Sequence, residues 1–92
     1  MMGKFIVVCT FKDAVAREEI AALVPAERAA AAALQERGAI GAIHLGMPRR
    51  TVFIEVNASN VAMAEQIVRE LPMAGLWDLD LFEIVPPAVA AA

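Results

Sequence analysis

The 92-residue sequence has few of the residues that build disulfides, metal centres or nucleic-acid interfaces. Its single cysteine, Cys9, has no partner in the chain, which is typical of a protein in a reducing cytoplasm. There is one histidine, no Cys/His/Asp cluster with ligand spacing and no glycine-rich phosphate loop, so we expect a site without metal or cofactor. The net charge of −3, with no basic stripe, argues against nucleic acid as a partner.

Long apolar runs are also missing, although apolar residues make up 60% of the chain. Charged pairs such as Glu18-Glu19 and Glu27-Arg28 interrupt these runs well before the ~20 residues of a membrane span. The apolar start at Phe5–Phe11 is too short for a secretory signal. A domain of this size hides only about two-thirds of its unfolded surface. We therefore expect a cytoplasmic homodimer or larger homo-oligomer and no membrane partner.

Hydrophobic periodicity predicts six elements in the order strand, helix, strand, strand, helix, strand. Their expected ranges are Lys4–Phe11, Asp13–Gly38, Ala39–Gly46, Thr51–Val56, Val61–Glu70 and Leu76–Ile84. This βαββαβ order indicates an α+β, ferredoxin-like fold, with a four-stranded antiparallel sheet and two helices on one face. We expect one domain over residues 1–85 and a flexible tail over residues 86–92. Because two helices cover only one face, a second copy is expected to cover the other.

Local signals refine two of these elements. In the first helix, Asp13 is the expected N-cap, and Gly38 is expected to end the helix in a left-handed conformation. Pro25 inside it predicts a kink or a break, because proline lacks the N–H donor. In the strand Ala39–Gly46, strict alternation places Ile40 and His44 on the same face.

Several segments resemble known families of the dimeric α+β barrel superfamily, in which two such sheets face each other. Those similar to muconolactone isomerases (LQ-x-x-G, SVFDV and LPLF-P-x-x-DIEV) are Leu34–Gly38, Val52–Val56, Leu71–Met73 and Trp77–Leu81; those similar to YciI-like proteins are Leu23–Glu27 and Ala74–Leu76. The resemblance implies a dimeric α+β barrel. It also implies that Glu27 matches a glutamate of the isomerases, at the place where YciI-like proteins carry a histidine.

Glu27 and His44 are the candidate catalytic residues. Glu27 lies two turns before Leu34 and so on the apolar helix face, where burial raises the pKa of a carboxylate. The alternative is a first-turn acid that complements the helix dipole and reaches solvent. The ordinary pKa of histidine, about 6.5, suits a proton shuttle, although a lone strand histidine is also a common structural residue.

Arg49, Arg50 and Trp77 are the candidate substrate-binding residues. Either arginine can hold a carboxylate through two hydrogen bonds, or both can be solvated charges at a hairpin tip. Trp77 either lines a pocket or packs at a sheet edge. Two functions follow. The first is a cofactor-free, muconolactone isomerase-like enzyme of aromatic catabolism that moves a proton on a small carboxylated lactone. The second is a non-catalytic or YciI-like barrel that binds a small molecule.

Overall fold

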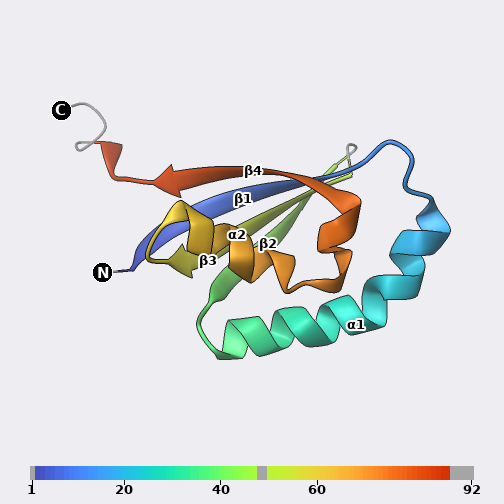
Figure 1. Cartoon of the computed structure of the whole chain (residues 1–92), viewed down its shortest axis with the longest axis horizontal. Coiled ribbons are helices and arrows are strands. Elements are labelled where there is room, and N and C mark those ends of the chain that lie inside the picture. Colours follow the sequence, from blue (N-terminus) through green and yellow to red (C-terminus); the bar gives the residue numbers. More distant parts are fainter. Residues whose placement is uncertain (1, 48–49, 88–92) are drawn as a thin grey trace.

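The structure, a computed structural model, describes residues 2–47 and 50–87. Its elements are the strands β1 (Gly3–Phe11), β2 (Ile40–Gly46), β3 (Thr51–Ala58) and β4 (Trp77–Ile84), the helices α1 (Arg17–Glu36) and α2 (Val61–Arg69), and the 3-10 helix η1 (Pro72–Leu76). The predicted α+β class and βαββαβ order are confirmed (Figure 1). Of the predicted features, residues 88–92 of the tail and Arg49 lie outside the described residues.

One antiparallel sheet carries the four strands in the order β2-β3-β1-β4. Both helices lie on the same side of it, below the sheet in Figure 1. This arrangement is the predicted ferredoxin-like topology. The strands β1 and β3 are central, whereas β2 and β4 are the edges.

Alternate side chains of the central strands form the core beneath the helices. Val7 on β1 is opposite Ile54 on β3, and both are almost fully buried. The helix α2 covers them with a stripe of buried side chains, whereas α1 contributes one buried residue, Leu34, and several partly buried ones. The buried core residues of the strands and helices are Phe5, Val7, Cys9, Leu34, Ile40, Val52, Ile54, Val56, Ala58, Ala64, Ile67, Val68, Met73, Ala74 and Trp77.

The first helix begins later than the sequence indicated. Its N-cap is Ala16 rather than Asp13, which lies in the preceding turn. The carboxylate of Glu19 accepts a hydrogen bond of 3.1 Å from the backbone N–H of Ala16. Glu19 therefore reaches back over the first turn and satisfies the backbone N–H of the N-cap residue, as the glutamate of a capping box does.

Pro25 does not break this helix. One helix runs from Arg17 to Glu36 through the proline, so the expectation of a break was wrong. Figure 1 shows the N-terminal turns of α1 inclined to the rest of the helix, as the alternative of a kink predicts. A single missing donor is tolerated because the turns on either side keep their hydrogen bonds and pack on the core.

The strand β2 contains a bulge that the sequence did not reveal. Ile40 is paired with Val56 and Ile43 with Ile54, so three residues of β2 advance while β3 advances two. The extra residue shifts the alternation, and Ile40 and Ile43 both face the helices. His44 is therefore on the opposite face from Ile40, and the expected shared face was wrong. The face on which His44 lies is decided by the pairing of β2 with β3. The two-residue period of a strand does not predict the bulge.

Gly38 provides the first test of these local assignments. Its φ is +76°, as expected of a helix stop, and an added Cβ would meet no atom within 4 Å. We predict that Gly38→Ala lowers the free energy of unfolding by about 1 kcal/mol, because only the left-handed backbone opposes it. Urea unfolding measures this change. The control is Gly75→Ala, which has the same open surroundings without the left-handed φ. Equal losses in the two variants would contradict the assignment.

Candidate functional site

An apolar cavity of about 280 Å³ lies on the helix face of the sheet, at the end where the β2–β3 hairpin turns. The helix α1 provides Ile20 and Val24, four residues apart and so on one side of the helix. The remaining lining residues are Phe11, Leu45, Gly46, Met47, Arg50, Thr51, Val52 and Met73. Only Arg50 among the ten carries a charge. The cavity therefore suits an apolar body with one anionic group.

Arg50 is held in place at this cavity. Its Nη2 donates a hydrogen bond of 3.1 Å to the carbonyl of Val15. Its guanidinium carbon lies 5.5 Å from the centroid of the Phe11 ring, a cation–π contact. These contacts position the planar group, and a guanidinium has further N–H donors for a bound carboxylate.

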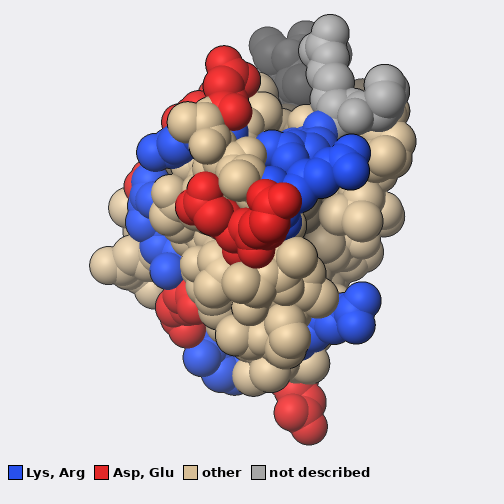
Figure 2. All heavy atoms as spheres, turned by 90° about the vertical axis from the view of Figure 1, so that its right-hand side faces the viewer, with Lys and Arg blue, Asp and Glu red and all other residues tan. Residues whose placement is uncertain are grey.

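A second, polar cavity of about 380 Å³ adjoins the first. It is lined by Thr10, Phe11, Lys12, Asp13, Arg50 and Thr51. Phe11, Arg50 and Thr51 line both cavities. Figure 2, which looks at this end of the molecule, shows Lys and Arg side chains gathered beside a group of Asp and Glu side chains. The polar cavity is thus lined by two cations, Lys12 and Arg50, and one anion, Asp13.

Glu27 lies one turn of α1 beyond Val24, is partly buried and is not among the residues that line the cavity. Its Oε1 accepts a hydrogen bond of 2.9 Å from the backbone N–H of Met73, a residue that lines the cavity. Burial raises the pKa of Glu27 above the ordinary range of a glutamate, and the Met73 N–H offsets part of this effect. A carboxyl group with a raised pKa is suited to proton transfer near neutral pH.

Cys9 lies beside this carboxyl group. It is fully buried on β1 and paired with Val52, another residue of the cavity wall. Burial raises the pKa of the Cys9 thiol to about 12, and the charge of the nearby Glu27 carboxylate contributes in the same direction. Cys9 is therefore a neutral thiol in the core and has no role as a nucleophile.

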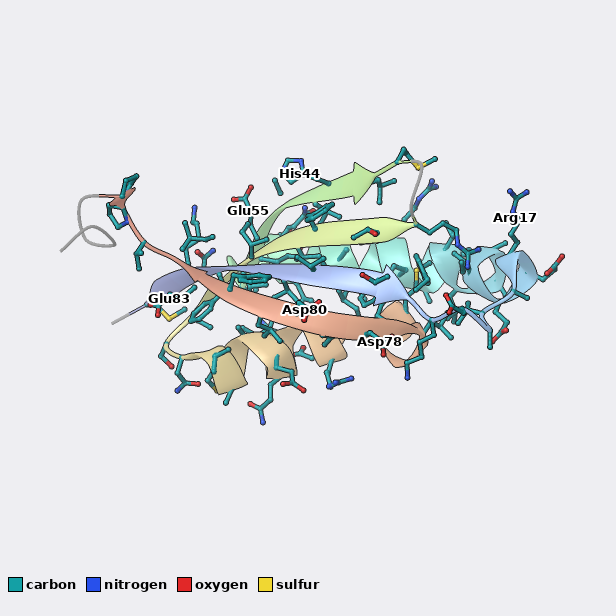
Figure 3. All side chains as sticks on the ribbon, turned by 90° about the horizontal axis from the view of Figure 1, so that it is seen from above. Arg17, His44, Glu55, Asp78, Asp80 and Glu83 are labelled. Carbon is teal, nitrogen blue, oxygen red and sulfur yellow. The ribbon has the colours of Figure 1, made fainter. Side chains whose placement is uncertain are left out.

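His44 lies on the other face of the sheet, away from Glu27. Its Nε2 is 3.4 Å from a carboxylate oxygen of Glu55 on β3. The Nζ of Lys4 is 3.8 Å from the other oxygen of the same carboxylate. Figure 3 views this open face and shows His44 and Glu55 close together. Within one chain, the sheet separates His44 from Glu27, because His44 is on the open face and Glu27 is on the helix side.

Trp77 is buried beside the site but does not line the apolar cavity. It is 3% exposed, and its ring packs edge-on against Phe11 with 5.9 Å between ring centroids. Its Nε1 has no hydrogen-bond partner among the described residues. Trp77 supports Phe11, which lines both cavities, and contributes itself to a separate cavity beside β4 and α2.

The sequence identified Glu27 and Arg50 but missed the apolar wall of the site. Ile20, Val24 and Glu27 are spaced at i, i+4 and i+7, which is one face of a helix. That spacing could have identified from the sequence the part of the wall that α1 provides. The contributions of Phe11, Met47 and Met73 come from three separate segments, and no local pattern relates them.

Comparison of the sequence with protein-family models and with curated proteins finds no match. In the described part of the chain, no group of three His, Cys, Asp or Glu side chains is placed to hold a metal ion. None of the described helices combines the length and the apolar character needed to cross a membrane.

The raised pKa of Glu27 predicts a pH-dependent stability. Between its ordinary pKa, near 4.5, and its raised value, the folded chain binds more protons than the unfolded chain. Stability therefore falls as the pH rises through this window. Glu27→Gln removes the charge and keeps an oxygen that can accept from Met73. We expect this variant to melt at a higher temperature than the wild type at pH 7–8, with the difference shrinking towards pH 4.

Thermal unfolding across this pH range measures the effect. Glu27→Ala is the matched control, because it removes the acceptor of the Met73 N–H together with the charge. It should be less stable than Glu27→Gln at every pH. A difference between wild type and Glu27→Gln that is constant with pH would show that Glu27 is not the titrating group.

Cys9 gives an independent test of burial at the same place. A buried thiol with a pKa of about 12 has almost no thiolate at pH 8. We expect alkylation by iodoacetamide at pH 8 to be at least about 100-fold slower in the folded protein than in urea. Mass spectrometry follows the reaction. Rapid alkylation of the folded chain would mean that β1 or the helices above it open readily.

Proposed function

We propose that the chain binds a small apolar carboxylate in the apolar cavity and moves a proton on it without a cofactor, in a muconolactone isomerase-like reaction. The observation that carries this proposal is the carboxyl group of Glu27, which has a raised pKa and is hydrogen-bonded to Met73 in the wall of an apolar cavity that also holds a positioned arginine. The reaction class is the one that the resemblance implies for Glu27, which matches a glutamate of the muconolactone isomerases.

In this proposal Arg50 holds the carboxylate of the substrate. Its contacts with Val15 and Phe11 orient the guanidinium before the ligand arrives, so little side-chain freedom is lost on binding. Lys12 and the hydroxyl groups of Thr10 and Thr51 extend the polar end into the adjoining cavity. The apolar side chains of the wall then contact the carbon skeleton of the substrate.

Glu27 is the base. Its carboxylate takes a proton from the carbon next to the substrate carbonyl, which leaves an enolate, and the resulting carboxylic acid returns the proton at another carbon of the same molecule. No oxidant or reductant is needed, because the C–H bond that breaks is replaced by a new C–H bond. A raised pKa brings the acid and base forms of Glu27 close in energy at working pH.

A non-catalytic binding protein is the second candidate. The observation that favours it is that Met73, and not Glu27, lines the cavity. If Met73 stays in place, a ligand contacts its side chain and does not reach the carboxylate. Binding without proton exchange is then the only activity.

Proton exchange in D₂O separates the two functions. Incubation with muconolactone and related carboxylated lactones, followed by NMR, detects both isomerisation and deuterium uptake at carbon. We predict turnover by the wild type and a loss of at least about 100-fold in Glu27→Gln, as expected for a general base. Glu18→Gln, an exposed acid in the first turn of the same helix, is the matched control.

Arg50→Gln should weaken substrate binding, seen as a raised KM, whereas the exposed Arg17→Gln should not.

Saturable binding without deuterium uptake would favour the non-catalytic candidate. Equal turnover by the wild type and Glu27→Gln would remove Glu27 from the mechanism.

A further inference from the structure

The strand β4 has one edge that pairs with no other strand. All of its residues, Trp77–Ile84, pair with β1 without a bulge, and β4 is the last strand of the sheet. Just before this ladder, the backbone N–H of Lys12 donates to the carbonyl of Leu76. Hydrogen-bonded and non-hydrogen-bonded pairs alternate along an antiparallel ladder. Because Leu79 and Leu81 are an odd number of positions from Leu76, their backbone N–H and C=O groups point away from β1.

These outward N–H and C=O groups of Leu79 and Leu81 are called here the free edge of β4. In the described part of the chain, no hydrogen bond reaches them. A cavity of about 320 Å³ adjoins them, and its walls include Trp77 and both leucines, which are half-buried. Unpaired backbone groups beside accessible apolar side chains are the features by which a sheet edge takes up an added strand.

The opposite edge of the sheet is less suited to such pairing. The bulge between Ile40 and Ile43 interrupts the row of backbone groups along β2. The side-chain amide of Gln35 also donates a hydrogen bond of 3.0 Å to the carbonyl of Gly41 on this strand. Along β4, all of which is described, neither feature occurs. The edge of β4 is therefore the one prepared for a partner.

Trp77 adds a buried donor without an acceptor at the same place. Its side chain is 3% exposed, and its Nε1 has no partner among the described residues. Indole N–H groups are usually hydrogen-bonded when they are buried. Trp77 also lines the cavity beside the free edge. A backbone carbonyl of a bound peptide is an acceptor of the kind that this donor lacks.

The charges along β4 indicate the chemistry of the partner. Asp78 and Asp80 are exposed on the face away from the helices, and Figure 3 shows them along this strand. Neither belongs to an ion pair within the described residues. Two cations line the adjoining cavity, but Arg69 is paired with Glu65 and Lys12 lies at the Asp78 end. Basic residues directly opposite the aspartates are therefore favoured, with Asp80 as the main determinant.

A second copy of this chain is a poor occupant of the free edge. If two β4 strands pair in antiparallel orientation about Leu79, Asp78 of each copy is opposite Asp80 of the other. If they pair about Asp80, the two copies of Asp80 are opposite each other. Like charges directly opposite each other destabilise a strand pair. The acids therefore favour a partner of a different sequence.

We propose that the free edge of β4 binds an extended peptide segment of a partner protein as an added antiparallel strand. Basic residues of the segment lie opposite Asp78 and Asp80, and an apolar residue between them lies opposite Leu79, towards the helices. The preferred pattern is thus basic, apolar, basic. The free edge includes neither Glu27 nor Arg50, so this binding does not depend on the proposed activity.

A synthetic peptide tests this binding through the fluorescence of Trp77, the only tryptophan in a chain without tyrosine. The test peptide is Thr-Val-Lys-Val-Lys-Val-Thr with both ends blocked, and its control carries glutamate in place of both lysines. We expect saturable binding of the lysine peptide and at least about tenfold weaker binding of the glutamate peptide. Asp80→Lys should weaken the binding of the lysine peptide and strengthen that of the glutamate peptide.

Methylation of the peptide backbone tests the strand pairing without a change in the protein. In the antiparallel arrangement, the N–H of the central valine donates to the carbonyl of Leu79, whereas the lysine N–H groups point away. An N-methyl group on the central valine should weaken binding by at least about tenfold. The same group on a lysine is the matched control and should have little effect.

Leu79→Pro is the corresponding change in the protein. Its N–H takes no part in pairing with β1, and proline is tolerated at such an edge position. We expect a folded variant, checked by circular dichroism, that no longer binds the lysine peptide.

Four outcomes would overturn the proposal. The lysine peptide fails to bind the wild type, or both peptides bind equally well, which removes the role of the aspartates. The two N-methyl groups have the same effect, which shows that the peptide does not pair as a strand. Light scattering detects a wild-type dimer that Leu79→Pro dissociates, which shows that a second copy occupies the edge.

Discussion

The pairing of β1 with β3 is the constraint on which the rest of the structure depends. These central strands place alternate side chains in the core, and Val7, Ile54 and Val56 are almost completely buried there. Because the side-chain period of a strand is two residues, this register also decides which residues face away from the helices. The edge strands, the helices and both cavities take their positions from it.

The two faces of the sheet differ in chemistry as a result. The helix face contains a carboxyl group with a raised pKa next to an apolar cavity, and burial of such an acid costs free energy that packing must offset. The open face holds its titratable groups near water, where His44, Glu55 and Lys4 contact one another. The helix face therefore holds a partly buried acid near an apolar cavity, and the open face holds a network of charged groups exposed to solvent.

The candidate site illustrates how far residue patterns lead. Glu27 was identifiable because an acid on the apolar side of a helix is unusual, and the structure places it near Met73, Cys9 and the cavity. His44 was expected in the same site because a lone histidine suits acid–base chemistry. The bulge between Ile40 and Ile43 changes the phase of β2, and His44 faces the other side. Simple alternation along β2 could not predict this, because the bulge arises from the pairing of β2 with β3.

The sequence by itself determined the class of fold, the order of the elements and most of their bounds, because hydrophobic periodicity and the helix stop at Gly38 act within a few residues. Tertiary structure alone decided which residues meet. The hydrogen bond from Met73 to Glu27 joins residues 46 apart, and the bond from Arg50 to Val15 joins residues 35 apart. Such contacts follow from how α1 and the β2–β3 hairpin pack on the sheet, and no local pattern specifies that packing.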